Sequence, residues 1–129
     1  MGDNGRMEGR SDPDVRVVVD EDGVIRLDWT AGITITEQAA QRAADYVNEL
    51  SADRRRPMIV NMAETAAVTR AARTVFLKAG AASMIALLGR SPVDRVIANF
   101  ILGVSNLPCP TRFFTGETAA RAWIAQQSG

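Results

Sequence analysis

The chain has 129 residues and a mass of 13.9 kDa, a size that suits one domain with one hydrophobic core. Its 15 basic and 15 acidic residues cancel, so no overall charge draws it to nucleic acid or to an anionic membrane surface. The sequence contains no histidine and therefore lacks the commonest general base and the commonest metal ligand. We expect no catalytic residues, no metal site and no cofactor.

The cysteine content and the hydropathy of the sequence indicate the cellular compartment. The single cysteine, Cys109, has no partner for an internal disulfide, and the N-terminus carries no apolar signal segment. No run of residues approaches the roughly 20 apolar residues that a membrane helix needs. These features predict a cytoplasmic protein without stable membrane insertion.

The N-terminal part predicts a tail followed by a hairpin. Residues 1–14 are rich in Gly and Asp without apolar periodicity, so we expect a disordered tail there and a single domain over residues 15–129. Two strands follow, Val15 to Val19 and Val24 to Trp29, around a turn in which Gly23 supplies the positive φ. Apolar and charged residues alternate in the second strand, which predicts one buried and one wet face.

The middle of the chain predicts two helices and two strands. An Ala-rich helix from about Glu37 to Ala52 is followed by a compact apolar strand, Met58 to Met62. Thr69 is placed to cap a helix that runs through Lys78. Ser83 to Leu88 is apolar without alternation, which is typical of a central parallel strand covered on both faces. The predicted inner stripe of the first helix is Ala40, Ala43, Val47 and Leu50.

The last third predicts a capped helix, a strand and a final helix. Ser91 is a suitable N-cap, Pro92 suits the first helical position, and Asp94 completes a capping box. A short strand from Arg112 to Thr115 follows a loop between two prolines. The predicted buried residues are Val93, Val96, Ile97, Phe100, Ile101 and Val104 in the first of these helices, and Ala119, Ala120, Trp123 and Ile124 in the last.

This order of elements predicts an α/β fold. Strand and helix alternate after the hairpin, which favours a mostly parallel sheet with right-handed crossovers. We expect five strands, with the N-terminal hairpin antiparallel at one edge, and four helices.

Two segments resemble a known family. GRSPVDRVIANFILGVSNLPCPTRFFTGETAARAWI and VTRAARTVFLKAG are similar to segments of the small bacterial SpoIIAA-like proteins, relatives of the STAS domain. The resemblance covers Val15 to about Gln126 and implies a SpoIIAA-like fold. STAS domains proper work by binding protein partners, whereas many plain SpoIIAA-like proteins have no assigned activity. In the anti-sigma-factor antagonists of that family, a serine at the start of the helix after the third strand is phosphorylated. Thr69-Arg70 stands here where those proteins carry Asp-Ser, so the switch serine is missing. Phosphorylation of Thr69 stays an alternative, and we expect Thr69 first of all to be a helix cap.

Candidate catalytic groups are few. Cys109 is the one covalent nucleophile to consider, but it has no histidine to activate it, which favours a structural thiol. Asp94 and Glu117 are explained as acids in the first turn of a helix, and only Glu64 lacks such a role.

A binding rim is easier to predict than a catalytic centre. Parallel sheets place ligand sites beyond the carboxyl ends of their strands, where helix N-termini offer free N–H groups. The segment Gly89 to Pro92 has a glycine, an arginine and a helix start with which an anion could be held, although no nucleotide-binding glycine motif is present. The predicted partner-binding or anion-binding rim consists of Asn61, Glu64, Thr69, Arg70, Arg73, Gly89, Arg90 and Ser91.

Two functions remain open on the sequence alone. The first is a non-enzymatic protein-interaction or regulatory module whose partner and pathway the sequence does not identify. The alternative is a small carrier or sensor of an apolar or anionic ligand. An apolar cavity would favour the carrier, whereas a solid core with an exposed apolar patch would favour the interaction module. A homodimer is a further expectation, through an uncovered sheet face flanked by Arg26 and Asp28.

Overall fold

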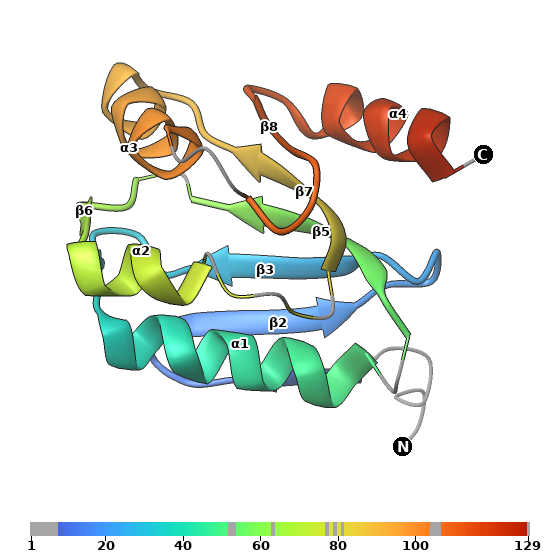
Figure 1. Cartoon of the computed structure of the whole chain (residues 1–129), viewed down its shortest axis with the longest axis horizontal. Helices are drawn as coiled ribbons and strands as arrows, with labels where there is room; N and C mark the ends of the chain where they lie inside the picture. Colours follow the sequence, from blue (N-terminus) through green and yellow to red (C-terminus); the bar gives the residue numbers. More distant parts are fainter. Residues whose placement is uncertain are drawn as a thin grey trace.

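The computed structural model describes residues 8–51, 54–62, 64–76, 78, 80, 82–103 and 107–128 (Figure 1). The strands are β1 (Glu8–Ser11), β2 (Val15–Val19), β3 (Ile25–Trp29), β4 (Thr34–Ile35), β5 (Arg56–Asn61), β6 (Ala67–Val68), β7 (Ala82–Leu88) and β8 (Thr111–Phe114). The helices are α1 (Glu37–Ser51), α2 (Arg70–Phe76), α3 (Pro92–Leu102) and α4 (Glu117–Ser128). The predicted order of hairpin, helix and three strand–helix units is confirmed.

The main sheet has the strand order β1-β2-β3-β5-β7-β8. Strands β1, β2 and β3 pair antiparallel, whereas β3, β5, β7 and β8 pair parallel. The predicted α/β class, with a mostly parallel sheet and an antiparallel N-terminal hairpin, is therefore confirmed, and β1 extends the predicted five strands to six. Strands β4 and β6 form a separate parallel pair that joins the segments preceding α1 and α2.

The predicted tail extends too far into the chain. Residues 8–11 pair with β2, from Glu8 opposite Val19 to Ser11 opposite Arg16. Asp12 then accepts hydrogen bonds from Arg42 Nε at 3.0 Å and from the Tyr46 hydroxyl at 2.9 Å, both on α1. These long-range contacts hold residues that composition alone assigns to a tail. Residues 1–7 lie outside the described part.

The helices divide between the two faces of the sheet (Figure 1). Helices α1, α2 and α3 share one hydrophobic core with the sheet, and α4 forms a second core on the opposite face. The first core is the larger and includes the predicted inner stripe of α1. Members of the second core are Val24, Ile59, Met84, Ala86, Leu88, Ala120, Trp123 and Ile124.

Helix α3 buries a narrower strip than its apolar pattern predicts. Its buried residues are Asp94, Ile97, Ala98 and Ile101, while Val93 and Val96 are 58% and 67% exposed. Among the described residues no element covers the outer side of α3, so the two valines are exposed. Phe100 is half-buried, and the predicted member Val104 lies outside the described residues. On α4, Ala119 is exposed, which corrects its predicted place on the inner face.

Ion pairs also hold helix α4 against the sheet face that we expected to be uncovered. Arg26 Nη1 on β3 donates to Glu117 Oε1 at 2.6 Å, and Arg121 Nη2 lies 3.0 Å from Asp20 Oδ2. Part of the surface predicted for a dimer is therefore covered within the chain itself. None of the helices in the described residues has the length and apolar character that crossing a bilayer requires.

Candidate functional site

The carboxyl ends of β5 and β7 meet around the buried carboxylate of Asp94. This side chain is only 1% exposed. Its Oδ1 accepts the backbone N–H of Glu64 at 3.1 Å, and its Oδ2 accepts those of Arg90 at 2.7 Å and Ser91 at 3.1 Å. Ser91 Oγ in return accepts the Asp94 N–H at 3.1 Å, so the predicted capping box is confirmed. Asp94 thus joins the start of α3 to the loop after β5.

The position of Asp94 depends on the absence of a side chain at Gly89. A Cβ atom there would lie 2.7 Å from Asp94 Cβ and 2.9 Å from Phe113 Cε1, closer than such atoms approach each other. Gly89 therefore lets the chain that follows β7 pass between Asp94 and the ring of Phe113 on β8.

Asp94 fills the place that an external anion would take. Its burial raises the pKa of the carboxyl group, but the hydrogen bonds from Arg90, Ser91 and Glu64 outweigh this effect and hold the pKa below its ordinary value. The group is therefore ionised at neutral pH and uses the N–H groups that were predicted to hold an anion. An incoming anion would have to displace it.

The rest of the predicted rim does not converge on one point. Thr69 Oγ1 accepts the Ala72 N–H at 3.0 Å, which confirms its role as the cap of α2. Arg70 is exposed, and the guanidinium carbon of Arg73 stacks 4.5 Å from the centre of the Phe100 ring. Asn61 donates to Asp28 Oδ1 at 3.0 Å. The structure thus gathers Glu64, Gly89, Arg90 and Ser91 around Asp94, with the other predicted residues in separate contacts.

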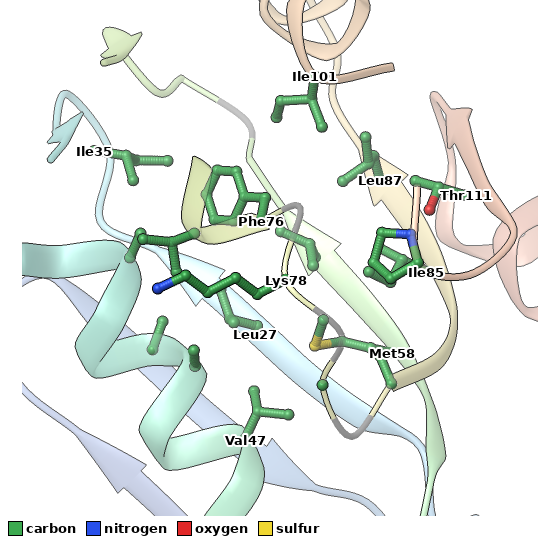
Figure 2. A pocket seen from close by; sticks show the side chains of 18 of the residues that line it. Leu27, Ile35, Val47, Met58, Phe76, Lys78, Ile85, Leu87, Ile101 and Thr111 are labelled. Atoms are coloured by element: carbon green, nitrogen blue, oxygen red, sulfur yellow. The ribbon is translucent and has the colours of Figure 1, made fainter. Parts of the chain in front are cut away.

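A second candidate site lies inside the molecule, between the sheet and the first three helices (Figure 2). It is a cavity of about 210 Å³ whose walls are mostly apolar. The sheet contributes Leu27, Trp29, Met58, Val60, Ala82, Ile85 and Leu87; α1 contributes Ala40, Gln41, Ala43, Ala44, Val47 and Asn48; Val75, Phe76 and Ile101 come from α2 and α3; and the loop around Cys109 closes one end.

Cys109 lines this cavity and is unsuited to nucleophilic catalysis. The thiol is half-buried, and burial raises its pKa above the ordinary value. It is therefore protonated at neutral pH, and the thiolate is the reactive form. Among the described residues, no group of three or more His, Cys, Asp or Glu side chains is placed to hold a metal ion.

The sequence analysis missed the cavity and also missed Lys78. Lys78 is exposed and is the one charged side chain among the described residues that line the cavity. Two signals in the sequence point this way: Lys78 is the only lysine of the chain, and the inner face of α1 is rich in alanine. Small side chains on a helix that faces a sheet leave volume that larger ones would fill.

Comparison with known proteins places this fold in a family. The sequence matches the family described as "Domain of unknown function (DUF7793)" over residues 18–128, a span that includes both the Asp94 rim and the cavity. The chain belongs to the DUF7793 family. No curated protein matches this DUF7793 chain.

Two solved structures are similar to this DUF7793 chain. One is a protein with unknown function from Arthrobacter sp. FB24, which is 53% identical over 85% of this chain and 92% of its own, with a TM-score of 0.35. The other is an uncharacterised DUF3478 protein with a SpoIIAA-like fold from Shewanella loihica PV-4. It is 15% identical, with coverage of 92% and 91% and a TM-score of 0.53. The predicted SpoIIAA-like fold is therefore confirmed.

Proposed function

We propose that this DUF7793 chain is a non-enzymatic cytoplasmic binding module that holds a small apolar ligand in its central cavity. The observation that carries the proposal is the cavity itself, about 210 Å³ of apolar-walled space in a chain of 129 residues. Of the two functions that the sequence left open, the carrier or sensor of an apolar ligand is the one that this space favours.

The size of the cavity supports occupancy by a ligand. Protein interiors pack to the density of organic crystals, and an empty cavity costs about 24 cal/mol for each Å³. An engineered apolar cavity of about 150 Å³ binds benzene. A partly open cavity of about 210 Å³ suits a molecule of about eight to twelve non-hydrogen atoms. Ligand binding would recover the contacts that the empty space lacks.

A neutral alcohol tests this proposal directly. We expect 1-octanol, titrated into the ¹⁵N-labelled protein, to shift the amide resonances of residues that line the cavity, such as Leu27 and Ile85. Ala44→Leu adds three carbons to the cavity wall on α1, so we expect it to weaken octanol binding about tenfold while the fold is retained.

Ala125→Leu is the matched control, because Ala125 is exposed on α4 and lies outside the cavity. It should leave octanol affinity within about twofold of the wild type. Shifts that are absent from the cavity residues, or equal losses in the two variants, would refute ligand binding in this cavity.

The second candidate function is protein interaction through the outer side of α3. Val93 and Val96 are the exposed large hydrophobic residues of the described chain, and they lie one turn apart beside the rim residues Arg90 and Ser91. A SpoIIAA-like fold fits such a module. The partner that we propose for this surface is a second copy of the chain, because a twofold contact places the valines of one α3 against those of the other.

Light scattering at micromolar concentration tests this self-association. We expect a mass near twice 13.9 kDa for the wild type and near 13.9 kDa for the double variant Val93→Ser, Val96→Ser. Ala122→Ser on the exposed side of α4 serves as a control that should leave the mass unchanged. A wild type that is monomeric would exclude the dimer. A double variant that stays dimeric would show that the dimer forms through another surface.

A further inference from the structure

The chemistry at the mouth of the cavity indicates which apolar ligand fits. Lys78 follows the C-terminal end of α2 and is fixed there by its backbone N–H, which donates to the Val75 carbonyl at 3.2 Å. Its side chain extends toward α1, passing between Phe76 and Leu27 in the view of Figure 2. The alkyl stem thus covers apolar wall while the ammonium group remains in solvent.

The ammonium group of Lys78 has no counter-charge at the cavity. Among the described residues it takes part in no ion pair, and none of the described lining residues carries a carboxylate. The cavity lining also includes the amide side chains of Gln41 and Asn48 on α1, both exposed. Gln41 Nε2 donates to Asp45 Oδ1 at 3.1 Å, and Asp45 itself is outside the cavity lining. The described lining therefore offers a positive charge and no carboxylate.

We infer that the ligand is an apolar monocarboxylate, whose hydrocarbon part lies in the cavity and whose carboxylate pairs with Lys78. The inference deepens the proposed function, because it names the head group of the ligand in the same cavity. An amine of the same length would bring a second positive charge to Lys78, and an alcohol would bring none. Selectivity among these three therefore identifies the head group.

The expected effect is moderate because the ion pair is partly exposed. Exposed pairs of this kind contribute little, so octanoate should bind about fivefold more tightly than 1-octanol at neutral pH and low salt. Octylamine should bind more weakly than the alcohol. High salt should reduce the advantage of octanoate and leave octanol binding unchanged.

The experiment compares the three probes by NMR titration in four proteins. In Lys78→Gln we expect octanoate and octanol to bind with equal affinity, and Lys78→Arg should keep the preference for octanoate. Arg54→Gln removes an equal charge from an exposed position outside the cavity and should behave like the wild type. Octanol affinity should be the same in all four proteins.

Each result has a defined meaning. Equal affinity of octanol and octanoate in the wild type, or a preference for octanoate that survives Lys78→Gln, would overturn the monocarboxylate inference while octanol binding still supports the proposed function. If neither probe reached the cavity residues, the proposed function would fail and this inference with it.

Discussion

Replacing Asp94 with alanine is expected to lower the free energy of unfolding by about 3 kcal/mol. The carboxylate accepts three backbone N–H groups, from Glu64, Arg90 and Ser91, and is buried. Its removal leaves these donors without their acceptor and also breaks the capping box of α3. Urea denaturation of the wild type and the variant near neutral pH measures the difference.

The pH dependence gives this effect a signature. The pKa of Asp94 is lower in the folded chain than in the unfolded one, where it is about 3.9. Its contribution to stability is therefore complete above about pH 4 and is lost as the pH falls through the folded-state pKa. The gap between wild type and Asp94→Ala should be constant near neutrality and should narrow in acid.

Glu37→Gln provides the matched control for Asp94, because Glu37 is an exposed acid in the first turn of α1. It should change stability by less than about 0.5 kcal/mol. A loss below about 1 kcal/mol for Asp94→Ala would show that water replaces the carboxylate at little cost. That outcome would reopen the anion site predicted for Gly89 to Pro92.

The parts of this fold that were predictable from sequence are set by local signals. Ser91, Pro92 and Asp94 specify a helix start within four residues, and the structure has that cap. Gly23 sits in the hairpin turn with the predicted positive φ of 80°. In β7, the uninterrupted apolar run reflects cover on both faces. Each of these features depends on residues that are close together in the sequence, so one sequence is enough to predict it.

The parts that sequence did not predict depend on distant contacts. Strand β1 is held by pairing with β2 and followed by the contacts of Asp12 with α1, and composition carries no sign of either. Val93 and Val96 are exposed because the described elements cover only a narrow strip of α3, and the helical period does not reveal the width of that strip. The cavity is a shortfall of volume among several elements, so the alanine-rich face of α1 is a sign of it but does not define it.

The candidate rim was also predicted only in part, because its local features were visible in the sequence and its long-range contact was not. The strand ends and helix starts were placed correctly, so Glu64, Gly89, Arg90 and Ser91 were expected near one another. The role of Asp94 was underestimated, because the sequence shows it as a first-turn acid and does not show the Glu64 N–H that it also accepts. That long-range bond makes Asp94 the centre of the rim.

The two hydrophobic cores lie on opposite faces of the sheet, so they should respond to mutation separately. Trp29 lines the cavity on the face of α1, and Trp123 anchors α4 on the other face. They are the only two tryptophans of the chain, and both are buried. The pair therefore allows stability and ligand binding to be distinguished.

Trp123→Ala is expected to cost about 3 to 5 kcal/mol of stability, a typical value for deleting a buried aromatic side chain. Trp123 is 7% exposed and packs against Phe114, with ring centres 5.6 Å apart. Its loss uncovers the apolar surface of β5 and β7 at Ile59 and Met84. Thermal or urea unfolding measures the cost, and Trp123→Phe serves in its place if the alanine variant does not fold.

Octanol binding is expected to remain within about twofold of the wild type in either Trp123 variant, because the sheet separates this residue from the cavity. Trp29 is then the sole tryptophan and its fluorescence reports binding directly. Trp29→Ala is the counterpart: it should cost a similar amount of stability but change octanol affinity, since it alters the cavity wall. A change of about tenfold in octanol affinity in the Trp123 variants would show that the two faces are coupled, and α4 would then take part in binding.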